Sequence, residues 1–313
     1  MPRTGRRGTR RAPLIAHRGK RNRCTWRQGS GFFVMPRRSA RAARAASMTA
    51  VGYSRQPERL RKRSPAMRKN LLITGASRGI GRATALLAAA GGWTVGVNYR
   101  SDRAAADEVV AQIEAMGGTA VALPGDVANE QEVQRLFEAM DRLGPLHGLV
   151  VNAGIVAPPL PLLEMSGERL RRMFDVNVLG SYLTAREGAR RMARSRGGEG
   201  GSMVLVSSVA ASLGAPFEYV DYAGAKGAMD VLTRGLAKEL GGEGVRVNAV
   251  RPGLIDTEIH ASGGQPDRAE RLGKATPLGR AGRAEEVAEA IVWLLDDKAS
   301  YTTGALIDIA GGR

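Results

Sequence analysis

Two residues with ionisable side chains, Tyr222 and Lys226, stand four positions apart in the stretch "DYAGAKGAMD" (221–230). On a helix this spacing places both side chains on one face, one turn apart. A free tyrosine has a pKa of about 10, so it exchanges a proton poorly near neutral pH. A nearby cation lowers that pKa, so the pair predicts general acid–base chemistry. The alternative is a solvated helix face that carries a tyrosine and a lysine without catalytic use.

A glycine-rich turn, "TGASRGIG" (74–81), directly follows the apolar run "NLLIT" (70–74). Its glycines, Gly75, Gly79 and Gly81, have the spacing Gly-x3-Gly-x-Gly. Glycines between a strand and a helix let the backbone approach a pyrophosphate, which then rests on the N-terminus of the helix. The turn therefore predicts a dinucleotide site, with a plain tight turn as the alternative.

Further motifs follow in the order "NAG" (152–154), "DVN" (175–177), Ser207–Ser208 and the Tyr222–Lys226 pair. With this set, the chain from about residue 68 to its C-terminus resembles the short-chain dehydrogenase/reductase family. The stretch "EYVDYAGAKGAMD…VRVNAVRPGLIDTEIHASGG" is most similar to a bacterial sugar dehydrogenase-like and 3-oxoacyl-ACP reductase-like branch. The resemblance implies an NADP-dependent oxidoreductase that acts on CH–OH groups and interconverts a carbonyl and an alcohol.

The resemblance also implies a role for four catalytic residues. Tyr222 is expected to be the general acid and base, with a pKa lowered toward neutrality by Lys226, which would also hold the nicotinamide ribose. Ser208 would orient the substrate oxygen, and Asn177 would interrupt a helix and hold a water in a proton relay. Ser208 stands 14 residues before Tyr222, one more than in many members of the family, and Ser207 fits less well.

The end of the second predicted strand, "VNYRSD" (97–102), is expected to select the cofactor. An acid there would bind the ribose hydroxyls of NAD. Arg100, together with Arg78 from the glycine turn, instead suits the 2′-phosphate of NADP, because a guanidinium binds phosphate oxygens bidentately. NADP is therefore the preferred cofactor and NAD the alternative, with Asp102 as the residue that argues for NAD.

The other cofactor contacts are carried over from the resemblance. Asp126 and Val127 would bracket the adenine, and Thr257 would bind the nicotinamide carboxamide. A Gly-rich lid is expected around 254–280, in which His260 is predicted to be exposed and without a catalytic role. The complete expected set is Gly75, Ser77, Arg78, Gly79, Ile80, Gly81, Asn98, Arg100, Asp126, Val127, Asn152, Ala153, Gly154, Tyr222, Lys226, Pro252, Gly253, Ile255 and Thr257.

Short apolar runs alternate with longer helical stretches from residue 70 onward. Strand runs that are nearly continuous in Val, Leu and Ile indicate parallel strands covered on both faces. The alternation predicts an α/β fold with a doubly wound parallel sheet, the Rossmann fold, in a single domain. Strands are expected at 70–74, 93–99, 119–126, 146–154, 202–208, 245–250 and 305–312, and helices at 81–92, 103–118, 129–144, 166–194, around Tyr222 and at 284–296.

The net charge of +17 comes from the N-terminal segment. Residues 1–66 contain 19 lysines and arginines and a single acid, Glu58, whereas the rest of the chain has a net charge of −1. We expect a disordered Arg-rich extension at 1–66 and an NAD(P)-binding domain at 67–313. The extension has three open interpretations: a basic arm for nucleic acid or an anionic membrane surface, an organelle transit peptide, or, as favoured here, an extension outside the working protein with translation starting at Met67.

The remaining composition narrows the class further. Cys24 is the single cysteine, which excludes an intrachain disulfide and fits a reducing compartment, so a cytoplasmic location is expected. The three histidines lie far apart, so no metal site is expected, and no apolar run reaches the ~18 residues of a membrane span. We expect a small-molecule substrate and a homodimer or homotetramer, with nucleic acid as a partner only if the basic arm is retained. A catalytically silent NADP-binding regulator is the other alternative, although the chain keeps every motif residue.

Overall fold

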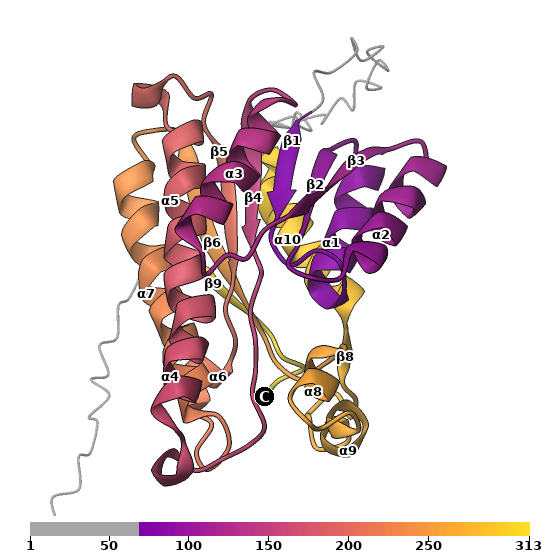
Figure 1. The fold of residues 1–313 in the computed structure, drawn as a ribbon, viewed down its shortest axis with the longest axis vertical. Helices are drawn as coiled ribbons and strands as arrows, with labels where there is room; N and C mark the ends of the chain where they lie inside the picture. Colours follow the sequence, from indigo (N-terminus) through magenta and orange to yellow (C-terminus); the bar gives the residue numbers. More distant parts are fainter. Residues whose placement is uncertain (1–68) are drawn as a thin grey trace, which may run out of the picture. The chain divides into compact units, whose positions relative to one another are not determined.

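The computed structural model of the protein describes residues 69–313. These residues form a seven-stranded parallel sheet with the strand order β3-β2-β1-β4-β5-β6-β9 (Figure 1). The order reverses between β1 and β4, which makes the sheet doubly wound and confirms the predicted fold class. The strands are β1 (Asn70–Ile73), β2 (Thr94–Tyr99), β3 (Thr119–Pro124), β4 (Leu146–Val151), β5 (Gly201–Val206), β6 (Val245–Pro252) and β9 (Leu306–Ile309).

Strand β1 illustrates why the sheet needs helices on both faces. Leu71, Leu72 and Ile73 are all completely buried. Leu71 and Ile73 belong to one apolar core and Leu72 to the other, because successive side chains of a strand point to opposite faces. A strand that is apolar on both sides is stable only between two layers of helices.

Helices cover the two faces as two separate layers (Figure 1). Residues of α1, α2 and α10 contribute to one apolar core, and residues of α3, α5 and α7 contribute to the other. The bounds of these helices are α1 (Gly79–Ala90), α2 (Arg103–Ala115), α3 (Glu130–Asp141), α5 (Gly180–Met192), α7 (Val220–Leu240) and α10 (Ala284–Leu295).

The single helix expected over 166–194 is divided into three segments. α4 (Gly167–Phe174) is followed by a π-helical segment, η2 (Asp175–Leu179), which leads into α5. A π segment interrupts the regular helical ladder and often marks a functional position. Asn177, the residue expected to cause an interruption, lies in the middle of this segment.

Several short elements complete the described part of the chain. A small parallel sheet is formed by β7 (Ile255–Asp256) and β8 (Gly282–Arg283), and the segment between these two strands in the sequence is the region in which a lid was expected. That region contains α8 (Ile259–Ser262) and α9 (Arg268–Gly273), which lie together near β8 in Figure 1. The others are η1 (Leu162–Glu164), η3 (Arg194–Arg196), α6 (Ala210–Leu213) and η4 (Asp297–Ala299).

The predictions made for residues 1–66, including a basic arm, a transit peptide and a start at Met67, lie outside the described residues. The boundary between the extension and the domain therefore stays a prediction. Within 69–313, no helix is long and apolar enough to cross a membrane.

Candidate active site

A cavity of about 870 Å³ lies at the carboxyl ends of the central strands. It is lined by the glycine turn after β1, by residues 152–156 after β4, by residues 206–210 at the end of β5, and by residues 252–260 after β6. In an open parallel sheet, ligands bind outside these strand ends, where the strand order reverses. The fold therefore brings segments separated by more than 170 residues to one site.

The glycine turn has the backbone shape that its composition predicts. Gly75 and Gly79 have φ angles of +63° and +54°, in the region that favours glycine. A Cβ atom added to Gly81 would lie 2.4 Å from the carbonyl oxygen of Gly75, so this position tolerates only glycine. Asn152 holds the turn from β4, because its Nδ2 donates to the carbonyl oxygens of Thr74 (2.8 Å) and Gly75 (2.9 Å).

Asn98 supports the same turn from β2. Its Oδ1 accepts a hydrogen bond from the backbone N–H of Gly75 at 3.1 Å. Its Nδ2 lies 3.1 Å from the carbonyl oxygens of both Leu123 and Gly125. The side chain is buried, and these contacts use its acceptor and donors. Asn98 lines the cavity as expected, and the contacts that it makes shape the turn.

The cavity wall at the end of β2 carries positive charge. Arg78 and Arg100 are exposed and both line the cavity. Asp102, which argued for NAD, also lines the cavity, and its Oδ1 caps α2 by accepting from the backbone N–H of Ala105 at 3.0 Å. A further guanidinium, that of Arg172 on α4, lies 3.6 Å from the carboxylate of Asp126 at the cavity.

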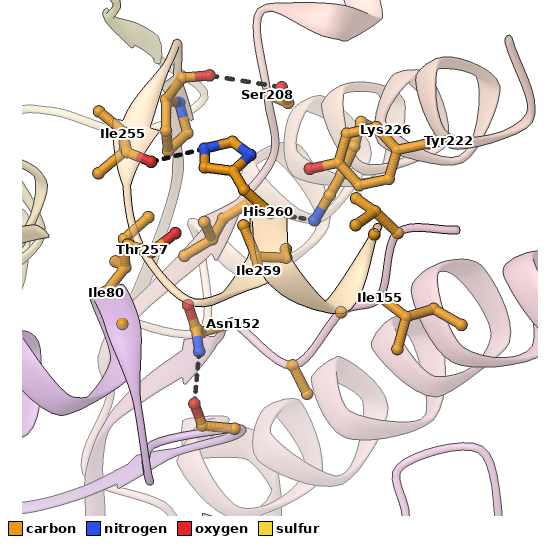
Figure 2. A pocket seen from close by; sticks show the side chains of 18 of the residues that line it. Ile80, Asn152, Ile155, Ser208, Tyr222, Lys226, Ile255, Thr257, Ile259 and His260 are labelled. Atoms are coloured by element: carbon orange, nitrogen blue, oxygen red, sulfur yellow. Dashed lines mark hydrogen bonds between the residues drawn. The ribbon is translucent and has the colours of Figure 1, made fainter. Parts of the chain in front are cut away.

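Ser208, Tyr222 and Lys226 meet at the opposite wall of the cavity (Figure 2). Ser208 follows the end of β5, while Tyr222 and Lys226 lie one turn apart on α7. The ammonium of Lys226 lies 5.5 Å from the centre of the Tyr222 ring and donates to the carbonyl oxygen of Val206 at 2.7 Å. The three residues that the sequence separates by up to 18 positions therefore form one cluster.

The acid–base behaviour of this cluster differs from the expectation. Burial raises the pKa of Tyr222 to about 12, and a hydrogen bond with Ser208 acts in the opposite direction on this pKa. Burial lowers the pKa of Lys226 to about 8, against the charge of Asp230, which raises it. The pKa of Tyr222 is therefore shifted upward in this structure, whereas a fall toward neutrality was expected. The reason is that the removal of water from the phenol outweighs the neighbouring polar groups.

Asn177 lies behind the cavity and does not line it. Its side chain is completely buried. Oδ1 accepts from the backbone N–H of Ile155 at 2.9 Å, and Nδ2 donates to the carbonyl oxygen of the same residue at 3.0 Å. Asn177 thus ties the π-helical segment to the loop after β4, on which Gly154 stands. Its expected role in a proton relay stays a prediction.

The site residues fit a nicotinamide dinucleotide. Two glycines with positive φ angles open the backbone at the turn, and the cavity runs from this turn to the Tyr222 cluster. Of all the expected catalytic and cofactor-binding residues, only Gly81 and Asn177 do not line this cavity. Among the described residues, no group of three or more His, Cys, Asp or Glu side chains is arranged to hold a metal ion.

Sequence reasoning missed a polar group that lines the cavity. Arg268 on α9 pairs with Glu218 at 2.7 Å, and its guanidinium lies 5.0 Å from the centre of the Tyr219 ring. No motif signals this group, because its members come from two segments about 50 residues apart. His260 is also half-buried and not exposed as expected, since its Nε2 donates to the carbonyl oxygen of Ile255 at 2.8 Å (Figure 2). Burial lowers the pKa of His260.

A doubly wound sheet with a glycine turn and a Ser–Tyr–Lys cluster on one cavity defines a Rossmann-fold oxidoreductase. A family model described as enoyl-(acyl carrier protein) reductase matches residues 75–313. The chain belongs to the short-chain dehydrogenase/reductase family, whose members use NAD(P)(H) and act on alcohol or carbonyl groups.

Individual relatives agree with this membership. The chain is 53% identical over 243 residues to the uncharacterized oxidoreductase YgfF of Escherichia coli, which covers 77% of this chain and 98% of the relative. It is 40% identical over 246 residues to an L-rhamnose 1-dehydrogenase (NAD(P)(+)) of Sphingomonas, with coverage of 78% and 95%. The crystal structure of a short-chain type dehydrogenase/reductase from Mycobacterium marinum superposes with a TM-score of 0.73 at 36% identity, and covers 78% of this chain and 94% of that one.

Proposed function

We propose that this protein is an NADP-dependent oxidoreductase that interconverts a carbonyl and an alcohol on a small molecule, with Tyr222 as the general acid and base. The observation that carries this proposal is the convergence of Ser208, Tyr222 and Lys226 on the cavity whose other end is the glycine turn. The same cavity therefore offers a dinucleotide cradle and a proton donor to one substrate.

The nicotinamide, when bound, supplies or accepts the hydride. The glycine turn would hold the pyrophosphate, Asp126 the adenine and Thr257 the carboxamide. Ser208 would donate a hydrogen bond to the substrate oxygen and so orient it toward the hydroxyl of Tyr222. Tyr222 would then give its proton to the oxygen of a carbonyl, or take the proton of an alcohol in the reverse direction.

The acid–base state of the cluster supports reduction at neutral pH. Because burial raises the pKa of Tyr222 to about 12, its phenol carries the proton that a carbonyl oxygen needs. Lys226 has a pKa of about 8, so most of its ammonium groups are charged at pH 7 and stabilise negative charge that develops on the phenol. Alcohol oxidation is expected to need a higher pH, at which Tyr222 can accept a proton.

The preference for NADP is supported by the charges at the end of β2. The guanidinium groups of Arg78 and Arg100 both line the cavity and are exposed there. Asp102 also lines the cavity, and its Oδ1 caps α2, so that one of its two carboxylate oxygens is occupied by the helix. A 2′-phosphate in this part of the cavity would therefore meet two cations.

We further propose that the protein is a homodimer or homotetramer. Apolar side chains stay exposed along α4, η2 and α5, namely Phe174 (43%), Leu179 (48%) and Tyr182 (42%). On α7, Val231 is 64% exposed. A second copy that packs against these helices would bury these side chains together. A cytoplasmic location also stays a prediction from the sequence.

Replacement of Tyr222 by phenylalanine tests the proposed function. The variant keeps the ring and loses the proton donor, so turnover is expected to fall by about two to four orders of magnitude. The assay follows NADPH absorbance with a panel of ketones, aldehydes and sugars. NADPH binding, measured by calorimetry, is expected to change little. Near-normal turnover of the best substrate by Tyr222→Phe would refute the assignment.

A further inference from the structure

A buried polar pair, Ser207 and Asp230, lies beside the backbone of Lys226. Ser207 and Ser208 are neighbours in the chain, but only Ser208 approaches Tyr222. The hydroxyl of Ser207 lies 2.6 Å from Oδ1 of Asp230 and 3.0 Å from the carbonyl oxygen of Lys226. Ser207 also lines the cavity, and its hydroxyl connects the end of β5 to α7.

Asp230 is the charged residue of this pair. It lies four residues after Lys226, so both project from the same face of α7. Only 8% of Asp230 is exposed, and 5% of Lys226. A buried charge needs an opposite charge or strong hydrogen bonds. The ammonium donates its hydrogen bond to a neutral group, the carbonyl oxygen of Val206. Asp230 is thus the buried carboxylate one helical turn beyond Lys226, although its oxygens contact Ser207 and Arg251 and none lies within 4.0 Å of the ammonium.

The other side of Asp230 faces a cation that is already paired. Arg251 on β6 lies 3.4 Å from Oδ2 of Asp230. The same guanidinium donates to Oδ2 of Asp308 at 2.9 Å, and to Oγ of Ser212 at 2.9 Å. Arg251 and Asp308 are direct partners in the register of β6 and β9. Arg251 is therefore shared between two carboxylates, those of Asp230 and Asp308.

We propose that Asp230 is a positioning residue for Lys226, which supplies the buried countercharge of its ammonium and, through Ser207, holds the strand end that bears Ser208 against α7. This inference rests on the proposed function for its catalytic meaning. The negative charge of Asp230 raises the pKa of Lys226, although burial lowers this pKa overall. The other ionisable groups in contact with this cluster are Tyr222, whose ring centre lies 5.5 Å from the ammonium of Lys226, and Arg251, which pairs with both Asp230 and Asp308.

Two substitutions with opposite expected signs test this inference. Asp230→Asn keeps the shape of the side chain and removes its charge, so the pKa of Lys226 is expected to fall by about one unit or more. Arg251→Gln removes the cation that competes for Asp230, so the pKa of Lys226 is expected to rise. If these residues had only a structural role, both substitutions would destabilise the protein. The pKa of Lys226 would then not move in opposite directions in the two variants.

The pKa of Lys226 can be measured without cofactor or substrate. The full chain contains seven lysines, so ¹³Cε-lysine labelling gives a small set of NMR signals, and the signal that is lost in Lys226→Met identifies Lys226. In Asp230→Asn, the loss of kcat/KM at alkaline pH is also expected to begin about one pH unit lower than in the wild type. If no substrate is turned over, the NMR titration still decides whether Asp230 controls Lys226, while Tyr222→Phe decides the proposed function.

The matched control is Glu187→Gln. Glu187 on α5 is another buried carboxylate, paired with Arg190 and Arg191, and it lies outside the cavity. This substitution is expected to lower stability without a shift of the Lys226 titration. An unchanged Lys226 titration in Asp230→Asn would overturn the inference, as would a shift of the same sign in both test variants. If Asp230→Asn does not fold, the absence of an upward shift in Arg251→Gln overturns it.

Discussion

Gly154 lies next to Asn177 and Lys226, and both side chains can come close to it because glycine has no side chain. A Cβ atom added at Gly154 would lie 2.7 Å from Oδ1 of Asn177 and 3.5 Å from Nζ of Lys226. The first contact is about 0.5 Å too short for a carbon and an oxygen, so the substitution Gly154→Ala must displace one of them. Asn177 is completely buried and holds both backbone polar groups of Ile155, so it cannot move freely.

The cost of this displacement can be estimated from these contacts. Overpacking of a buried site costs about 1–3 kcal/mol. Weakening of a hydrogen bond to Ile155 adds about 1 kcal/mol. The smaller conformational freedom of alanine in the unfolded chain returns about 0.4–1 kcal/mol. The expected net loss is about 2 kcal/mol, which corresponds to a decrease in Tm of about 4–8 °C for a domain of this size. A displaced Lys226 or Asn177 is expected to lower kcat by about 10- to 100-fold.

Thermal unfolding and steady-state kinetics measure these two effects, and Gly224→Ala is the matched control. Gly224 lies on α7 between Tyr222 and Lys226, and a Cβ atom there meets no described atom within 4 Å. Since alanine is favoured over glycine in a helix by about 1 kcal/mol, Gly224→Ala is expected to raise Tm by about 2–4 °C and to keep activity. If Gly154→Ala retains both the Tm and the kcat of the wild type, the inferred crowding of Asn177 and Lys226 is refuted.

Three further predictions concern the cofactor, pH and the N-terminal segment. Arg100→Ala is expected to weaken NADPH binding by about 1.5–3 kcal/mol and NADH binding much less, as measured by calorimetry; equal losses would show that Arg100 does not contact the phosphate. In the folded protein Lys226 has a pKa of about 8, below its ordinary value of 10.5, so the unfolded chain binds this proton more tightly. The contribution of Lys226 to the stability of the folded protein therefore rises between about pH 8 and 10.5. The raised pKa of Tyr222 lowers the stability again, but only above pH 10, the ordinary pKa of tyrosine. The free energy of unfolding in urea is therefore expected to rise by about 1–2 kcal/mol between pH 8 and 9.5, and this rise is expected to be absent in Lys226→Met. A chain that starts at Met67 is expected to fold, bind NADPH and form a dimer or tetramer by light scattering; an insoluble product would place part of the fold before that residue.

The sequence by itself determined the class of the fold and most of the candidate site. Apolar runs such as 70–74 predict buried parallel strands because β-strands bury both faces in a doubly wound sheet. The glycine turn and the Tyr222–Lys226 pair are local patterns, in which spacing along the chain sets the relative positions of the groups. Arg78 and Arg100 were recognised in the same way, from their places after two strands that end at the same edge of the sheet.

Only the tertiary structure decided how these residues are surrounded. Asp102, the residue that argued for NAD, lines the cavity and also caps a helix, and Asn98 shapes the glycine turn from the neighbouring strand. The pKa of Tyr222 rises where a fall was expected, because loss of water depends on every segment that closes around the phenol. Likewise, Asp230 on α7 contacts Arg251 only because α7 packs against β6, and Arg251 contacts Asp308 because β6 pairs with β9. Burial and charge balance arise from contacts between distant parts of the chain, and no local spacing encodes them.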